Sequence, residues 1–165
     1  MEHIFSVHSI SPSQVLRGEG SWEKGKYLLP NLCRRPLLLG KSKETKRIRE
    51  SITKELENLD LTVTNTNLHY GCCEIDLKRI EILSSKNKCD AIIATGGGKV
   101  LDAGKLIANR LNINCITIPT SAATCAGWTA LSNIYSQNGA FIKDVKLNKC
   151  PNLLIFEHKF IKTAP

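Results

Sequence analysis

Residues 90–105 read Asp90-Ala-Ile-Ile-Ala-Thr-Gly-Gly-Gly-Lys-Val-Leu-Asp-Ala-Gly-Lys105. An apolar run leads into three glycines, and apolar side chains then recur at helical spacing. This order predicts a buried strand, a glycine turn and a helix that opens with Lys99. The first N–H groups of a helix lack partners within it, the helix dipole is positive there, and glycines admit a ligand close to the backbone. The stretch therefore predicts a phosphate site at Gly97 and Gly98, with a purely structural turn as the alternative.

The alternation of strand and helix extends to both sides of this stretch. Helices are predicted at about 43–59, 74–88 and 99–111, and Ser42 is the expected N-cap of the first. A β-hairpin with its turn at Asn138-Gly139 is predicted within 130–145. Apolar or β-branched runs predict strands at 36–40, 61–66, 90–95, 115–120 and 152–156. We therefore expect an α/β fold, a Rossmann-like parallel sheet with flanking helices, as one domain over residues 1–165.

Composition and charge restrict the class of protein. Of the 165 residues, 42% are hydrophobic and 23% are charged, as in ordinary globular proteins. No apolar run approaches the ~20 residues of a membrane-spanning helix, and the N-terminus does not have the pattern of a signal peptide. We therefore expect a cytoplasmic protein that does not bind membranes. The net charge of +8 comes with only 5% aromatic residues, so we expect no nucleic-acid partner.

The cysteines and histidines do not form a recognisable metal site. The seven cysteines include the adjacent pair Cys72 and Cys73 but no C-x-x-C pair, and no histidine lies at a ligand-like offset. We therefore expect reduced thiols, several of them buried, and we assign no metal ligand and no catalytic residue from these patterns.

Two segments follow neighbouring predicted strands, where parallel sheets bind their ligands. The glycine turn fits neither the P-loop pattern nor G-x-G-x-x-G, because Leu101 stands where the third glycine of the latter belongs. Residues 119–124, Pro-Thr-Ser-Ala-Ala-Thr, offer three hydroxyls that suit a diphosphate or a ribose. On the helix between the two segments, Asp102 and Lys105 predict either a solvated ion pair or a carboxylate directed into the cleft.

Three strings together resemble a known family. Gly96–Lys105 is followed by Ile118-Pro-Thr-Ser-Ala-Ala-Thr124 and by Ala130-Leu-Ser-Asn-Ile-Tyr135, and the tail 152–165 is similar as well. These strings resemble iron-containing (metal-dependent) alcohol dehydrogenases, and most closely glycerol dehydrogenases. The resemblance implies an N-terminal nucleotide-binding domain. Enzymes of the family transfer a hydride between NAD or NADP and a small alcohol, a polyol or the corresponding carbonyl, with a metal polarising the oxygen.

The resemblance also implies roles for individual residues. Gly97, Gly98 and Lys99 would hold the pyrophosphate of the nicotinamide dinucleotide, and Asp102 would lie near its nicotinamide end and the substrate. Glycerol dehydrogenases typically have an aspartate where this chain has Cys125, so the resemblance does not extend to glycerol as the substrate. The rest of the cofactor cleft would be lined by Thr120, Thr124, Thr129, Leu131 and Tyr135.

The end of the strand at 36–40 bears on the choice of cofactor. NAD-preferring members of the family carry an aspartate after this strand, where it binds the adenine ribose. Here the residues are Gly40, Lys41 and Ser42. A lysine and a hydroxyl in place of an acid favour a 2′-phosphate, and hence NADP over NAD. The alternative is that Lys41 is ordinary surface charge.

The family's metal ligands belong to a helical C-terminal domain that would begin after the position of Pro165. The 165 residues contain none of that domain, and the four histidines match no ligand position: His3, His8, His69 and His158. A divalent metal, Zn or Fe, is therefore expected only together with the C-terminal domain, and we expect no dehydrogenation by this chain alone. Non-catalytic nucleotide-binding modules, glycerol-1-phosphate dehydrogenases and 3-dehydroquinate synthases are the alternatives, and a homo-oligomer stays open.

Overall fold

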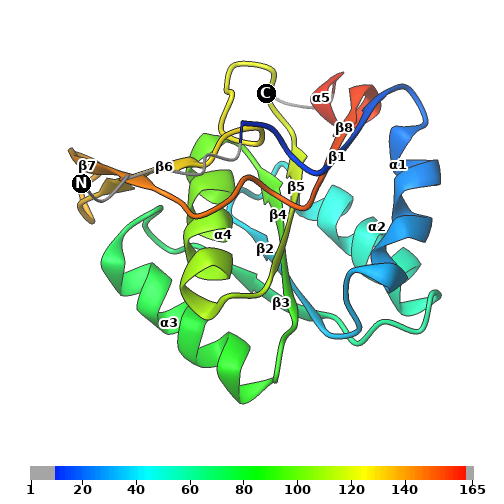
Figure 1. Ribbon diagram of the computed structural model, residues 1–165, viewed down its shortest axis with the longest axis horizontal. Coiled ribbons are helices and arrows are strands. Elements are labelled where there is room, and N and C mark those ends of the chain that lie inside the picture. Colours follow the sequence, from blue (N-terminus) through cyan, green and yellow to red (C-terminus); the bar gives the residue numbers. More distant parts are fainter. Residues whose placement is uncertain (1–9, 163–165) are drawn as a thin grey trace, which may run out of the picture.

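The computed structural model describes residues 10–162 and has a six-stranded sheet at its centre (Figure 1). Every pair of neighbouring strands is parallel, as the alternation of strands and helices predicts. The order across the sheet is β1 (Gln14–Gly18), β8 (Leu153–Glu157), β5 (Asn114–Pro119), β4 (Ala91–Gly96), β2 (Pro36–Gly40) and β3 (Thr64–Asn67).

Alternate residues of the central strands enter two separate cores. Leu37 and Ile92 pack on one face beneath α3 (Glu74–Lys86) and α4 (Gly98–Leu111). Their sequence neighbours Leu38 and Ile93 pack on the other face, which α1 (Ser21–Gly25), the 3-10 helix η1 (Lys26–Asn31) and α2 (Lys46–Glu57) cover. Figure 1 shows α1 and α2 on one side of the sheet and α3 and α4 on the other. Because strand side chains alternate and both faces are covered, β2 and β4 are apolar at nearly every position.

Helix α4 lies unusually close to the middle of the sheet. A Cβ atom placed on Gly104 would stand only 2.5 Å from the Cβ of Ala94 in β4. Real Cβ atoms do not approach so closely, so glycine at this position lets the helix settle directly on the strand. The contact seats the middle of α4 on β4, the strand whose carboxyl end leads into the predicted phosphate site.

The predicted hairpin forms a small sheet of its own. Strands β6 (Leu131–Tyr135) and β7 (Phe141–Lys146) pair antiparallel, and Gly139 in the turn has a φ of 87°. The N–H of Tyr135 donates to the carbonyl of Cys72 at 2.8 Å. The apolar side of β6 packs in the same core as the side chains of α4. The hairpin therefore lies over the helix that starts at the glycine turn (Figure 1).

Two predicted boundaries are wrong. Strand β3 begins at Thr64, because Thr62 instead donates to the carbonyl of Arg34 near the start of β2. Helix α2 begins at Lys46, and Thr45 rather than Ser42 takes its N-cap position. The Ser42 hydroxyl accepts the N–H of Thr45 at 3.3 Å, which makes a turn ahead of the helix.

Residues 14–31 and the short helix α5 (His158–Lys162) carry structure that the sequence patterns do not predict. Strand β1 is an edge strand whose exposed positions are polar or lightly apolar, so its sequence lacks a clear apolar run. Its partner β8 lies some 140 residues along the chain, with Gln14 opposite Leu153. Only the tertiary fold brings this pair together.

Within residues 10–162, the helices are too short or too polar for any of them to cross a bilayer. No disulfide links the seven cysteines, all of which lie in this part of the chain, and five of them are buried. His3, His8 and the last three residues of the predicted family-like tail, 163–165, lie outside the described residues.

Candidate functional site

The glycine turn joins β4 to α4 and serves two different steric purposes. A Cβ on Gly96 would stand 2.9 Å from the Cβ of Val100, so this glycine is required by packing. Around Gly97 a Cβ would meet nothing within 4 Å. The carbonyl of Gly97 accepts the N–H groups of Val100 and Leu101, at 3.0 and 3.2 Å, so the N–H groups before them have no acceptor within the helix. The turn therefore presents free donors and open space at the positive end of a 14-residue helix.

A pocket of about 340 Å³ opens in front of this turn, and we call it the glycine-turn pocket. It contains six of the residues that the sequence singles out: Lys41, Ser42, Gly97, Gly98, Lys99 and Thr120. Thr45 and Ser121 also line it. The ends of β2, β4 and β5 meet here because the three strands are parallel neighbours.

Two lysines converge on the rim of this pocket. The ammonium of Lys41 donates to the carbonyl of Tyr70 at 2.5 Å. A Cβ on Gly71 would lie 3.7 Å from the Nζ of Lys41 and 3.4 Å from the Cδ of Lys99. The loop at 69–71 thus lies beside both cationic side chains, and its Tyr70 carbonyl holds the ammonium of Lys41.

That loop is anchored by one buried carboxylate. Asp76 is fully buried, and its Oδ2 accepts the N–H groups of His69, Tyr70 and Gly71 at 2.8, 2.7 and 3.2 Å. Arg79 donates to its Oδ1 at 2.7 Å. Burial by itself would raise the pKa of Asp76, but the hydrogen bonds from Arg79 and the backbone outweigh it, and the pKa lies below its usual value. The loop is therefore held by a carboxylate that stays charged.

A second pocket, of about 350 Å³, lies between α4 and β6, and we call it the hairpin pocket. It shares the lining residues Gly98 and Lys99 with the glycine-turn pocket, so the two pockets adjoin at the glycine turn. The other six predicted residues line it: Asp102, Thr124, Cys125, Thr129, Leu131 and Tyr135. The two pockets together thus contain all twelve predicted site residues.

Asn133 also lines the hairpin pocket and was not predicted. Leu131, Asn133 and Tyr135 occupy alternate positions of β6, so their side chains leave the same face of the strand. The period of two between the predicted Leu131 and Tyr135 is the signal that could have found it.

Lys99 stands between the two pockets. Its Nζ lies 4.8 Å from the ring centroid of Tyr135, which is a cation–π distance. Gly98 beside it approaches Thr124, whose Oγ1 would be 3.2 Å from a Cβ at that position. A cation, free N–H groups and a hydroxyl therefore converge where the two pockets meet.

The ion pair of Asp102 and Lys105 is buried, so the expectation of a solvated pair is wrong. Only 6% of Asp102 and 2% of Lys105 are exposed, and Oδ1 and Nζ are 3.3 Å apart. Helix α4 carries both beneath the hairpin, which excludes water from them. Burial raises the pKa of the Asp102 carboxyl, and the ammonium of Lys105 opposes that rise. The alternative expectation, a carboxylate directed into the cleft, agrees with the place of Asp102 in the hairpin pocket.

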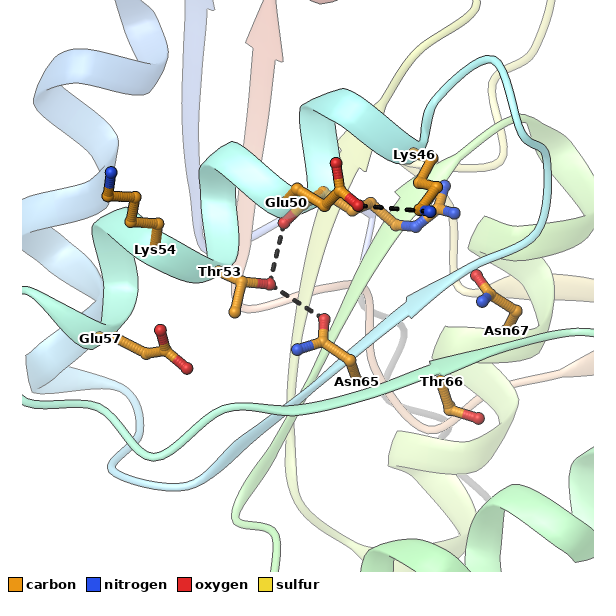
Figure 2. A pocket seen from close by; sticks show the side chains of 9 residues that line it. Lys46, Glu50, Thr53, Lys54, Glu57, Asn65, Thr66 and Asn67 are labelled. Atoms are coloured by element: carbon orange, nitrogen blue, oxygen red, sulfur yellow. Dashed lines mark hydrogen bonds and ion pairs between the residues drawn. The ribbon is translucent and has the colours of Figure 1, made fainter.

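A further groove lies between α2 and β3, away from the predicted residues (Figure 2). Its polar groups bond to one another: the Thr53 hydroxyl donates to the carbonyl of Arg49 at 2.9 Å and contacts Oδ1 of Asn65 at 3.0 Å. Lys46 and Glu50 form an ion pair of 3.5 Å along its edge. None of the predicted residues lines this groove, and we place the candidate site in the other two pockets.

The family model for iron-containing alcohol dehydrogenases matches residues 12–158. The chain belongs to the iron-containing alcohol dehydrogenase family. An uncharacterised oxidoreductase of Synechocystis is 36% identical over 156 residues, which are 94% of this chain and 40% of that protein. A glycerol dehydrogenase of Escherichia coli is 30% identical over 94% of this chain and 42% of its own length.

Solved structures of the family share the fold. The glycerol dehydrogenase of Schizosaccharomyces pombe matches 98% of this chain with 41% of its own, at 24% identity and a TM-score of 0.82. A probable glycerol dehydrogenase of Sinorhizobium meliloti matches 98% with 43% of its own, at 20% identity and a TM-score of 0.84. The chain thus spans about two fifths of the length of the curated relatives that it matches.

A zinc or iron ion, as in the iron-containing alcohol dehydrogenases, needs several His, Cys, Asp or Glu side chains around one point. Between residues 10 and 162, no three His, Cys, Asp or Glu side chains gather where they could hold a metal. The residues described here therefore do not fit a zinc or iron ion.

Proposed function

We propose that this chain is the cofactor-binding domain of an oxidoreductase that transfers a hydride between a nicotinamide dinucleotide and a small alcohol or polyol, or its carbonyl. The observation that carries the proposal is that the two pockets adjoin at Gly98 and Lys99, which line both. A dinucleotide has two mononucleotide halves joined by a pyrophosphate. Two pockets that meet at a helix N-terminus have the shape and the donors for such a molecule.

The side chains present fit the cofactor. Gly97 leaves open the space that a Cβ would fill, beside N–H groups that can donate to a pyrophosphate, and Lys99 adds a positive charge. The adenine half would occupy the glycine-turn pocket, with Thr120 at its wall. The nicotinamide half would occupy the hairpin pocket, against Leu131 and Tyr135.

The cofactor supplies the hydride chemistry when it is bound, and the protein binds and orients it. In this arrangement Thr124 and Thr129 offer hydroxyls to the nicotinamide half. Asp102 and Cys125 also line the hairpin pocket, and in this proposal they would face the substrate. The chain spans about two fifths of the length of its relatives, and we propose that catalysis, with zinc or iron, needs the remaining part of the family fold.

We further propose that the dinucleotide is NADP rather than NAD. Lys41 and Ser42 follow β2 and line the glycine-turn pocket, at the position where a carboxylate would repel a 2′-phosphate. The ammonium of Lys41 keeps donors in excess of its one bond to Tyr70.

Titration of the chain with NADH and NADPH, followed by nicotinamide fluorescence, tests both proposals. We expect NADPH to bind about tenfold more tightly, as one charge-assisted contact would give, and Lys41→Asp to reverse the order. Lys43→Asp makes the same charge change on a residue outside the pocket and should leave the order as it is. Equal affinities would contradict the 2′-phosphate proposal, whereas no binding of either dinucleotide would contradict the cofactor site itself.

A further inference from the structure

We propose that Lys105 is a positioning residue that fixes the wall of the hairpin pocket, and with it the nicotinamide half of the cofactor. The inference rests on the proposed function, because it assigns that half of the dinucleotide to the hairpin pocket. Lys105 lines neither pocket itself. It acts through the backbone of two residues that do line the hairpin pocket, Thr129 and Leu131.

The contacts of Lys105 converge on one point of the chain. Its Nζ donates to the carbonyl of Thr129 at 3.1 Å, to the Thr129 hydroxyl at 3.3 Å, and to the carbonyl of Leu131. Asp102 lies 3.3 Å away and balances the charge. The donors of one buried ammonium thus reach acceptors that lie just before and at the start of β6.

Packing alone does not explain a lysine at this position. Taking an ammonium out of water is costly even when it is paired, and a methionine of similar length would fill the same space without that cost. What a methionine cannot do is bind two carbonyls at once. The buried charge therefore fixes a backbone conformation that apolar packing would leave undetermined.

The segment that Lys105 holds at its end is also anchored nearer its middle, where the Thr117 hydroxyl donates to the carbonyl of Gly127 at 2.9 Å and the N–H of Trp128 donates to the carbonyl of Cys125 at 2.9 Å. Residues 120–130 form a loop without helix or strand, and it leads from the end of β5 to the start of β6. Besides the contacts with Lys105, the carbonyl of Ala130 accepts the N–H of Leu147 at 2.9 Å. Lys105 ties the end of this loop to α4, the same helix whose first turn would hold the pyrophosphate. One rigid helix would then set the distance between the pyrophosphate and the nicotinamide wall.

The test compares NADH with ADP-ribose, which carries the adenine half and the pyrophosphate but has no nicotinamide. Wild type, Lys105→Met and Lys105→Gln are titrated with each ligand, by fluorescence for NADH and by calorimetry for ADP-ribose. We expect Lys105→Met to weaken NADH binding by about tenfold and ADP-ribose by less than about twofold, since only the nicotinamide wall is released. Lys105→Gln retains an N–H donor and should fall between wild type and Lys105→Met, and it carries the test if the methionine variant does not fold.

A matched control separates positioning from general destabilisation. Ile52→Val removes one methyl from the opposite core at a residue that lines neither pocket, and it should leave both affinities unchanged. Equal weakening of NADH and ADP-ribose in the Lys105 variants would overturn the inference, as would no weakening of either. A wild type that binds NADH no better than ADP-ribose would also overturn it and leave the pyrophosphate site intact. A wild type that binds neither ligand would overturn the proposed function instead.

Discussion

At the scale of single residues, the three glycines of the turn are not equivalent. Val100 leaves no room for a Cβ at Gly96, and Gly98 approaches Thr124. Gly97 has open space around it and a φ of −83°, which any residue can adopt. In the sequence the three glycines cannot be told apart. Only their surroundings in the structure show which glycine is needed for packing and which one borders the pocket.

The substitution Gly97→Ala should therefore separate binding from stability. We expect the free energy of unfolding to change by less than about 0.5 kcal/mol, because the new methyl meets nothing. Dinucleotide affinity should fall by about tenfold or more, since the methyl occupies the space in front of the free N–H groups. Urea unfolding and NADH titration measure the two effects. Gly96→Ala is the contrast, because its methyl meets Val100 and should destabilise the fold.

At the scale of elements, helix α4 connects the two pockets. It begins at the glycine turn, carries Asp102 and Lys105 beneath the hairpin, and rests on β4 at Gly104. The apolar spacing after the glycines predicts this helix with nearly its observed bounds. What the spacing does not predict is that the helix packs so closely on the strand that glycine is needed there.

Gly104→Ala should destabilise the fold, which is the opposite of its usual effect inside a helix. In a helix interior, replacing glycine by alanine normally stabilises by about 1 kcal/mol. Here we expect a net loss of about 1–3 kcal/mol in the free energy of unfolding, because the new Cβ would stand 2.5 Å from the Cβ of Ala94 and must push the helix away from β4. The urea midpoint measures the change. A variant more stable than wild type would show that the helix-to-strand contact tolerates a methyl.

At the scale of the whole molecule, acid stability depends on carboxylates that keep a lowered pKa in the fold. Glu74 is one, through its hydrogen bond with Arg110, which joins α3 to α4. Asp76 is another, and it ties the loop at 69–71 to α3. Each favours the folded state only while it is charged.

Asp76 should contribute to the free energy of unfolding above its unfolded pKa of about 3.9. This contribution should be lost as the pH falls through the lower pKa that Asp76 has in the folded protein. We expect the free energy of unfolding to fall between pH 5 and pH 3, and Asp76→Asn to make it smaller at pH 5 and less dependent on pH. Urea unfolding across this range is the measurement. A wild-type dependence on pH in Asp76→Asn would contradict the prediction.

The sequence by itself determined the parts of this protein that depend on local periodicity. The buried strand at 90–95, the glycine turn, the helix after it and the hairpin at Asn138-Gly139 all follow from side chains a few residues apart. The family strings supplied the site residues, whose contact with a cofactor stays a prediction. Neither source predicts the pairing of β1 with β8 or the burial of Asp102 with Lys105.

Those features were decided by the tertiary structure alone, for a physical reason. A strand at the sheet edge is selected by a partner about 140 residues away, and nothing in its own short sequence specifies that partner. Likewise, Asp102 and Lys105 are three residues apart on a helix, a spacing that is typical of a solvated ion pair. They are buried only because the hairpin covers them. The free energy that keeps them buried comes from acceptors at Thr129 and Leu131, which only the fold brings within reach.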